Sequence, residues 1–398
     1  LEALGVAVRE YTVTAPRRPR VRLYGAVVGN GSFSRVADGM RLALAALGEL
    51  AGFVPIDAID DEEIYPGYDA PTGVYVGPPG QVALMASMGA HTYRWALLPA
   101  NSTWVPHELL MAMWPAVTGF LAPSMWAAEI LARHVALVEE KGRSTPWMRL
   151  CQEGGTGVEH RSVDVWQHGI DPRFIPSMTD HAALVKSYQE GHFEVLHLAS
   201  TARERKGTRE LILAWGSLVR RGALGERPTL RLLVDGPDDV FEDVIEDACR
   251  GEAAARRSIT RTRRHNLGVT DIAALYRQHP VVCQPSRGEA FGMVPLESRA
   301  SGVVICATAE TGHRAYMPTT APGMGFGMSI IRMGPLSPID DGPGALAPSL
   351  RLEDVATALG ESYRYWPVLG VAAQHGAFGV REQHSWPAVT RSWLLGAR

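Results

Sequence analysis

Two glutamates are spaced so that both could face one ligand. Glu289 and Glu297 lie in the segment QPSRGEAFGMVPLESRASG, which is typical of a strand end, a loop and a helix. We expect Glu289 in the loop and Glu297 about two turns into the helix, with both carboxylates toward one cleft. The junction between them, Phe291-Gly292-Met293, offers free backbone N–H groups and a helix dipole that suit a phosphate or sugar oxygen. The alternative is a capped core helix whose two glutamates are merely solvated.

Lys206 is a candidate cation for the same ligand. It precedes Gly207 in STARERKGTRELILAW, where a strand ends and an apolar-patterned helix begins. Taken alone this position is weak evidence, because lysines are common at the surface near helix starts.

A glycine turn, Gly29-Asn30-Gly31-Ser32, precedes the first predicted helix and makes Gly31 a candidate for holding phosphate through its N–H group. The motif is neither a dinucleotide fingerprint nor a P-loop. A tight turn that requires positive backbone φ explains these glycines equally well.

Strands and helices alternate along both halves of the chain. The first half contains VRLYGAVVGNGSFSRVADGMRLALAAL and TGFLAPSMWAAEILARH, each a strand, a turn and a helix. The second half starts at FEVLHLAS and repeats the alternation through GVVICATA. Such alternation predicts parallel sheets covered by helices on both faces. Two such sheets facing each other place a ligand cleft at the carboxyl ends of their strands.

The chain is long enough for two domains, since its 398 residues exceed the ~100–200 residues of one ordinary domain. We predict an N-terminal Rossmann-like domain over residues 1–185 and a second one over residues 186–375. A C-terminal helix, residues 376–398, is expected to pack back onto the first domain. The Gly- and Pro-rich residues 317–349 are predicted to form an irregular insertion near the cleft.

The composition is that of a globular protein, with 46% hydrophobic and 20% charged residues and a net charge of −3. It gives no global reason to expect nucleic-acid or membrane binding. No apolar run reaches about 18 residues, so no transmembrane segment is expected. The cysteines lack CxxC spacing, which argues against a zinc site or a disulfide framework and favours a cytoplasmic location; they are Cys151, Cys249, Cys283 and Cys306.

Residues 284–302 resemble the PSxxEGFGxxxxEAxAxG signature of retaining GT-B glycosyltransferases related to glycogen synthase, sucrose synthase and bacterial mannosyltransferases, the glycosyl transferases group 1. The resemblance extends over about residues 195–315, with Ala290 and Ser298 in place of a glycine and an alanine. It implies an α/β fold of the GT-B kind, two Rossmann-like doubly wound domains facing across a cleft. It also implies transfer of a sugar from a UDP- or GDP-sugar to an acceptor hydroxyl.

The resemblance assigns roles to matching residues. Glu289 is implied to contact the donor sugar, and Glu297 the ribose hydroxyls. The amides of Phe291, Gly292 and Met293 are implied to hold sugar and phosphate. Gly31 lies in the loop that closes over the diphosphate in this family.

Lys206 matches the lysine of the family's RxxxxKG element, which neutralises the departing diphosphate. Thr201 stands where that element has its arginine. Arg203 or Arg205 could supply the missing charge, and Arg205 is the candidate catalytic residue beside Lys206 and Glu289.

Neither a metal nor a cofactor is expected besides the nucleotide sugar. The acidic pairs of the chain read as loop residues rather than as a metal-binding pair at a strand end; they are Asp60-Asp61, Asp238-Asp239 and Asp340-Asp341. Catalysis would then rest on charge stabilisation and positioning.

The acceptor is left open by the sequence: a small molecule, glycan, lipid, protein or modified DNA. The strand ends of the N-terminal domain offer Asn101, Ser102 and Thr103 as acceptor-side candidates, while His91 precedes a strand and is expected to have a structural or surface role. The arginine run over residues 256–264 could bind DNA phosphates, although a solvated loop explains it as well.

Other interpretations remain open. A GT-B protein could glycosylate hydroxymethylated DNA bases, act as an epimerase or pyridoxal-phosphate-dependent phosphorylase, or bind nucleotide sugars without catalysis.

Overall fold

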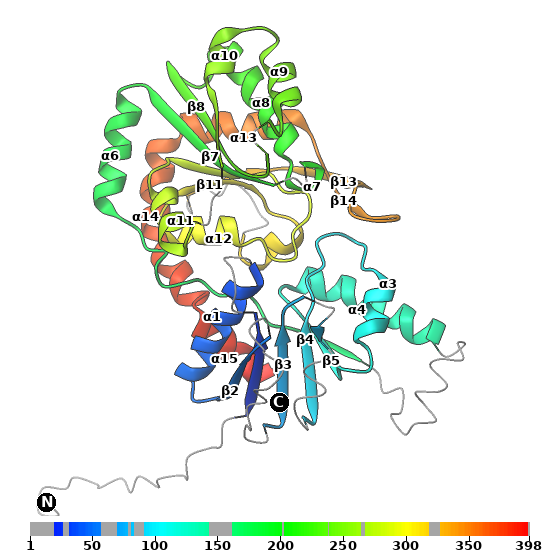
Figure 1. Ribbon diagram of the computed structural model, residues 1–398. Helices are drawn as coiled ribbons and strands as arrows, with labels where there is room; N and C mark the ends of the chain where they lie inside the picture. The colour runs from blue at the N-terminus through cyan, green and yellow to red at the C-terminus, as the bar shows by residue number, and fades with distance from the viewer. Residues whose placement is uncertain are drawn as a thin grey trace, which may run out of the picture.

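A computed structural model describes most of the chain, namely residues 20–26, 32–56, 70–78, 81–82, 91–142, 161–200, 203–237, 239–263, 267–317 and 327–396. These residues form two parallel six-stranded sheets and one two-stranded antiparallel sheet (Figure 1). The predicted α/β architecture with two Rossmann-like sheets is confirmed.

The N-terminal sheet has the strand order β2-β1-β3-β4-β5-β6. Its strands are β1 (Val21–Gly25), β2 (Leu50–Pro55), β3 (Thr72–Val76), β4 (Tyr93–Leu97), β5 (Gly119–Ala122) and β6 (Ser162–Val165). The helices on its two faces are α1 (Ser32–Ala46) and α15 (Trp386–Gly396) on one, and α3 (His107–Met113) and α4 (Met125–Gly142) on the other. Successive strand residues face opposite ways, so Leu23 packs in the first layer and Tyr24 in the second.

The C-terminal sheet has the order β12-β11-β10-β7-β8-β9. Its strands are β7 (His192–Ser200), β8 (Arg227–Asp235), β9 (Ile259–Arg263), β10 (Val281–Gln284), β11 (Val304–Thr308) and β12 (Met328–Ile331). The helices that follow them are α7 (Arg203–Lys206), α8 (Thr208–Arg220), α9 (Glu242–Cys249), α10 (Ala253–Arg257), α11 (Val269–Arg277), α12 (Met293–Ala300), the 3-10 helix η3 (Thr311–Ala315) and α13 (Leu352–Arg364). These elements build two buried layers, one on each face of the sheet.

The segment predicted to be irregular contains regular structure, so that prediction is wrong for its described part. Besides β12 it holds an antiparallel hairpin, β13 (Met333–Pro338) and β14 (Leu346–Leu350). The glycines and prolines that suggested irregularity cluster mainly in the hairpin turn around Gly342 and in residues 318–326, which lie outside the described residues. In Figure 1 the hairpin projects above α3, beside the N-terminal domain.

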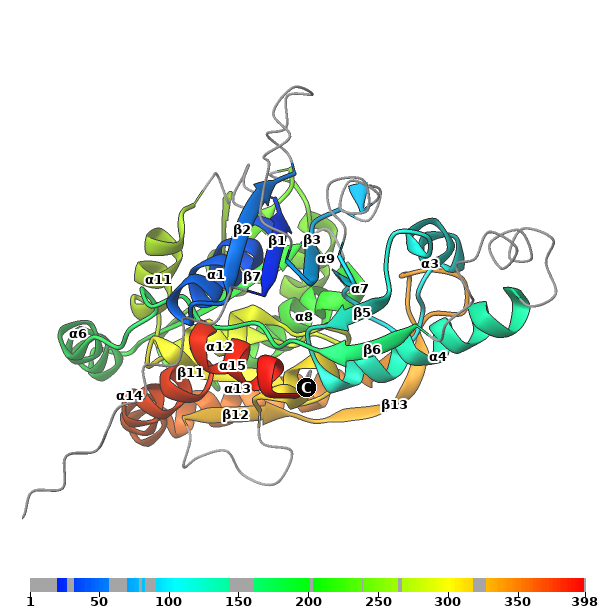
Figure 2. The same cartoon turned by 90° about the horizontal axis from the view of Figure 1, so that it is seen from below.

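Two helices at the end of the chain connect the domains. α14 (Trp366–Gln383) lies along the C-terminal domain together with α6 (Met178–Gln189), and α15 packs against α1 of the N-terminal domain. Trp393 of α15 stacks on Trp166 with ring centroids 4.1 Å apart, and Trp386 is buried in the same layer. Seen from below, α1 and α15 lie on the same side of the N-terminal sheet (Figure 2).

In the part of the chain that the structure describes, no helix combines the length and the apolar character needed to cross a bilayer.

Candidate functional site

The site is built at the carboxyl edge of the C-terminal sheet. β7 and β10 are parallel neighbours, so the segments that follow them emerge side by side. Lys206 follows β7 and Glu289 follows β10. Because β10 ends at Gln284 and α12 begins only at Met293, an eight-residue loop remains at this edge.

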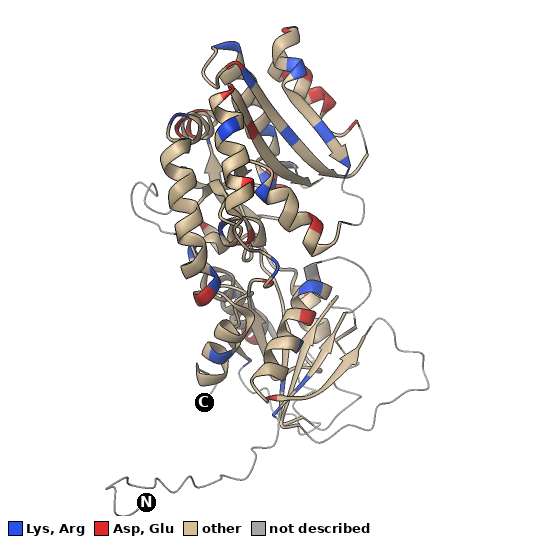
Figure 3. Ribbon diagram, turned by 90° about the vertical axis from the view of Figure 1, so that its left-hand side faces the viewer, with Lys and Arg blue, Asp and Glu red and all other residues tan. Residues whose placement is uncertain are grey.

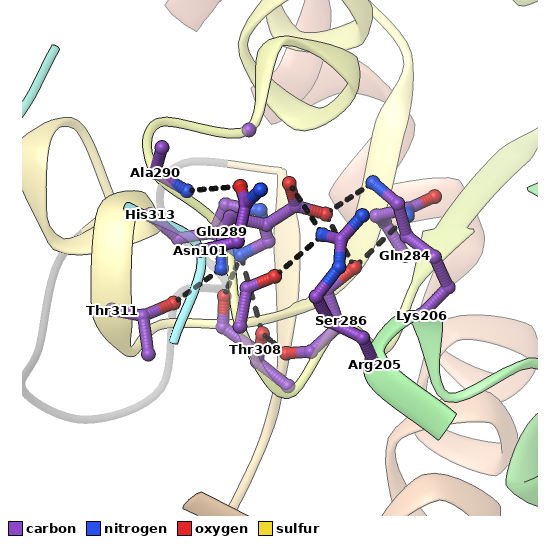
Figure 4. A network of polar contacts seen from close by, with 12 residues as sticks. Asn101, Arg205, Lys206, Gln284, Ser286, Glu289, Ala290, Thr308, Thr311 and His313 are labelled. Atoms are coloured by element: carbon purple, nitrogen blue, oxygen red, sulfur yellow. Dashed lines mark hydrogen bonds and ion pairs between the residues drawn. The ribbon is translucent and has the colours of Figure 1, made fainter. Parts of the chain in front are cut away.

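Glu289 is the centre of a polar network (Figure 4). Its Oε1 accepts hydrogen bonds from Lys206 Nζ at 2.5 Å and from Ser286 Oγ at 2.7 Å. Arg205 Nη1 lies 3.4 Å from Oε2 and donates to the carbonyl of Gly288 at 2.8 Å. The structure therefore brings the predicted catalytic residues Lys206, Arg205 and Glu289 together.

Electrostatics keep this glutamate ionised. Burial alone would raise the pKa of Glu289, but the positive charges of Lys206 and Arg205, with His313 and the Lys206 hydrogen bond, lower it to about 2. Two cations and one carboxylate leave a net positive charge at the edge of the sheet. Such a site favours an anionic ligand.

Local backbone geometry explains why Lys206 is held here. Gly207, the N-cap of α8, has a φ of 63°, and a side chain at this position would collide with the carbonyl of Pro285. Only glycine meets both conditions without strain. The short helix α7 is also tied to the loop, because the Arg287 N–H donates to the Arg205 carbonyl at 2.8 Å.

Glu297 lies about one turn into α12, not two as predicted, because the helix begins at Met293. Its side chain is 2% exposed. One carboxylate oxygen accepts from Tyr276 Oη at 3.2 Å, and the other pairs with Arg35, which reaches across from α1 of the N-terminal domain. Glu297 thus faces the junction between the two domains.

The turn that leads into α12 is packed against buried aromatic and histidine side chains. Gly292 has a φ of 81°, and a side chain there would meet the ring of His313. Phe291 is buried, with its ring 5.1 Å from that of His168 and 5.2 Å from that of Tyr316. The first N–H groups of α12, from Met293 onward, have no partner within the helix and are suited to bind an anion.

His313 is a site residue that the sequence did not reveal. It is fully buried, and its Nδ1 lies 2.8 Å from the Thr308 carbonyl, while its Nε2 has no hydrogen-bond partner among the described residues. Burial lowers its pKa, although the charge of Glu289 acts in the opposite direction. Its segment, AETGHRAY, carries no motif signal; only its place after a buried strand pointed to the sheet edge.

Two of the three acceptor-side candidates, Asn101 and Thr103, contact the C-terminal domain. Asn101 Oδ1 accepts from the Ala290 N–H at 3.1 Å, and Thr103 exchanges hydrogen bonds with Leu346 of the hairpin at 3.0 and 3.1 Å. Ser102 is buried and its Oγ accepts from the N–H of Trp104 at 3.3 Å. This loop therefore joins the loop between β10 and α12 to the hairpin.

One further prediction, that for Gly31, is not tested, and one interpretation of the arginine run is corrected. Gly31 lies outside the described residues. The described part of the arginine run, residues 256–263, lies on α10 and the edge strand β9 rather than in a loop, and Arg256 and Arg261 both pair with Glu242, at 2.9 and 2.5 Å. His91 is buried, as expected for a structural residue, with its ring nitrogens 2.7 Å from Tyr24 Oη and from the Ala70 carbonyl.

Comparison with known proteins agrees with this geometry. Residues 192–326 match the family model of glycosyl transferases group 1. A D-inositol 3-phosphate glycosyltransferase of Paenarthrobacter aurescens (strain TC1) is 28% identical over 155 residues, which are 38% of this chain and 36% of that protein. The aligned part spans little more than a third of that relative's length.

Solved structures share the fold of the whole chain. Sucrose-phosphate synthase of Thermosynechococcus elongatus superimposes with a TM-score of 0.60 at 14% identity, covering 96% of this chain and 100% of that one. HepE of Anabaena, solved in complex with UDP and glucose, gives a TM-score of 0.60 at 11% identity, covering 95% and 99%. The two sheets therefore define a GT-B fold.

Within that fold class, the C-terminal domain is similar to the glycosyl transferases group 1, whose family model matches residues 192–326.

Proposed function

We propose that the protein is a glycosyltransferase that moves a sugar from a nucleoside diphosphate donor to an acceptor hydroxyl with retention of anomeric configuration. The observation that carries the proposal is the placement of Lys206 and Arg205 around Glu289 at the start of α12. The UDP complex of HepE and the named activity of the P. aurescens relative support a nucleotide-sugar donor.

In this scheme the donor lies along the loop between β10 and α12. The diphosphate faces Lys206, Arg205 and the first N–H groups of α12, and the donor sugar donates a hydroxyl hydrogen bond to Glu289. Glu297 accepts from the ribose hydroxyls. Because Arg35 holds Glu297 in the structure, the ribose must displace or share that contact.

The chemistry follows from charge stabilisation. The bond between the anomeric carbon and the diphosphate oxygen breaks, and Lys206 and Arg205 stabilise the negative charge that develops. The acceptor oxygen then bonds to the anomeric carbon on the same face, and its proton passes to the departing phosphate. Glu289 is a poor nucleophile, since its Oε1 already accepts from Lys206 and Ser286.

The scheme requires no metal ion. Lys206 and Arg205 provide the positive charge that a divalent cation provides in metal-dependent phosphate chemistry. Among the described residues, no group of three or more His, Cys, Asp or Glu side chains is arranged to hold a metal. We expect turnover to be unchanged by EDTA, and loss of turnover with recovery on adding manganese would contradict the scheme.

A donor panel tests the function. UDP-, GDP- and ADP-sugars are added to the purified protein. The correct donor should increase the free energy of unfolding by about 2.7 kcal/mol at a hundredfold excess over Kd and thereby raise the melting temperature. Slow hydrolysis of that donor, followed by NMR, should release the retained anomer first.

A matched pair of variants locates the site. Lys206→Met should abolish most of the turnover, whereas Arg209→Met removes a 57%-exposed cation nearby and should leave it unchanged. If no donor shifts the melting temperature, or if Lys206→Met turns over like the wild type, the proposed function is wrong.

A further inference from the structure

The outer face of α14 is an exposed apolar surface. Val368, Val371 and Phe378 are 64%, 50% and 64% exposed. The opposite face, which includes Leu369 and Ala373, is buried against the C-terminal domain. A helix whose apolar residues lie on both faces has more to bury than its own domain covers.

The exposed residues follow the spacing of a helix–helix seam. Val368, Val371, His375 and Phe378 are separated by three, four and three positions, and all four are exposed. At about 100° per residue they fall within about 40° of one line along a helix. Alternation of three and four is the spacing by which two helices interlock side chains.

This seam is self-complementary. Val368 and Phe378 are equally far from Ala373 along the helix, and so are Val371 and His375. A second copy running antiparallel about a two-fold axis at Ala373 therefore places each Val opposite a larger ring of its partner. In a two-fold interface each contact occurs twice, and the symmetric spacing of these four residues about Ala373 allows that.

Charge at the ends of the helix fits the same arrangement. α14 carries no charged residue before Arg381 and Glu382 at its C-terminal end, as Figure 3 shows on the side where α6 and α14 lie. Arg364, at the corner between α13 and α14, is exposed at the other end. Antiparallel pairing brings Arg364 of each copy toward Glu382 of the other. It also places the dipoles of the two helices in opposite directions, which is favourable.

Apolar residues beside the seam extend it. Ile175, three residues before α6, and Met178, its first residue, are 43% and 70% exposed. α6 packs beside α14, where the ring of His181 lies 5.8 Å from that of Trp366. We propose that this surface, the α14 seam with the start of α6, is the interface of a homodimer with antiparallel α14 helices.

The oligomeric state tests the proposal without reference to catalysis. A specific interface usually buries about 800 Å² per partner, and a seam centred on one helix lies near or below that size, so dissociation in the micromolar range is expected. Sedimentation equilibrium of the wild type from 1 to 200 µM should show a mass that rises toward twice that of one chain.

Paired variants assign the surface. Val371→Glu with Phe378→Glu should weaken association at least a hundredfold while the monomer stays folded, because both positions are exposed. Leu42→Glu, at a 51%-exposed position of α1, is the matched control and should associate like the wild type. A wild type that stays monomeric at 200 µM, or a double variant that still dimerises, overturns the proposal.

Disulfide trapping tests the antiparallel register. Val368→Cys and Phe378→Cys should cross-link rapidly when the two variants are mixed and slowly when each is alone. Rapid cross-linking of Val368→Cys with itself would overturn the antiparallel arrangement. A monomeric wild type that floats with phosphatidylcholine–phosphatidylglycerol vesicles would overturn the dimer proposal. If Val371→Glu with Phe378→Glu abolished that flotation, the surface would bind lipid instead.

Discussion

Replacing Lys206 with methionine should separate the structural and the catalytic parts of the proposed site. The change keeps the length of the side chain but removes the ammonium group 2.5 Å from Glu289. Glu289 is then left with Arg205, at 3.4 Å, as its remaining cationic neighbour. Because the carboxyl group is only 8% exposed, water cannot replace the lost partner freely.

The magnitude follows from the pKa of Glu289. A value of about 2, against an ordinary value of 4.5, corresponds to about 3 kcal/mol in favour of the ionised form. Lys206 is the largest of the contributions that lower the pKa, so we expect the free energy of unfolding to fall by about 2 kcal/mol at pH 7. The folded-state pKa is depressed, so this contribution is present above pH 4.5 and is lost as the pH falls toward 2. The difference between variant and wild type should shrink over the same range.

A double-mutant cycle measures the effect. Urea unfolding is compared for the wild type, Lys206→Met, Glu289→Gln and the double variant. Glu289→Gln should lower the free energy of unfolding of the wild type. In the Lys206→Met background the same change should lower it less, or even raise it, so that the coupling energy is about 2 kcal/mol. Turnover should fall at least a hundredfold in Lys206→Met and should not return in the double variant. Additivity within about 0.5 kcal/mol would refute the reasoning.

Glu297→Gln should raise the donor KM about tenfold with a smaller effect on kcat, as expected for lost ribose binding, and an unchanged KM in initial-rate assays would contradict that role. Gly292→Ala adds a methyl group against the ring of His313 at a φ of 81°, so its melting temperature should drop by several degrees, corresponding to about 2 kcal/mol; unfolding at the wild-type temperature would argue against the strained turn. Burial lowers the pKa of His168 to about 3 and that of His197 to about 4, so unfolding takes up protons below pH 6.5. Chemical denaturation should therefore show about 4 kcal/mol less stability at pH 5 than at pH 7, and a flat profile would exclude buried neutral histidines.

The polar network around Glu289 could be predicted because each of its members lies close in sequence to the end of a strand. Each follows a strand within a few residues, and parallel strands end at one edge of the sheet. The apolar runs also predicted both sheets from local sequence, because the period of the apolar residues and the length of the run distinguish buried strands from amphipathic helices. The depth of Glu297 in its helix was misjudged, because the loop after β10 continues to Gly292.

Contacts between the domains could not be predicted from local patterns. Arg35 reaches Glu297 over 262 positions of the chain, and the Thr103 contact with Leu346 spans 243. Nothing in the sequence around Arg35 indicates its partner, since an arginine in the first turn of an amphipathic helix is ordinarily solvated. The hairpin was missed because its Gly- and Pro-rich composition resembles that of a loop, although its two strands pair and its Ala347 is buried against Trp104.

The position of Arg205 bears on the arginine that the family element lacks at Thr201. Thr201 itself lies outside the described residues. Arg205 instead immediately precedes Lys206 on α7, and its guanidinium is fixed by the Gly288 carbonyl and by Glu289. Both cations therefore converge on one carboxylate, and the network keeps a net positive charge despite the threonine. We infer that Arg205 supplies the second positive charge of the site from a different position in the sequence. Loss of Arg205 alone should therefore weaken the site as much as loss of the family arginine would in a relative that has it.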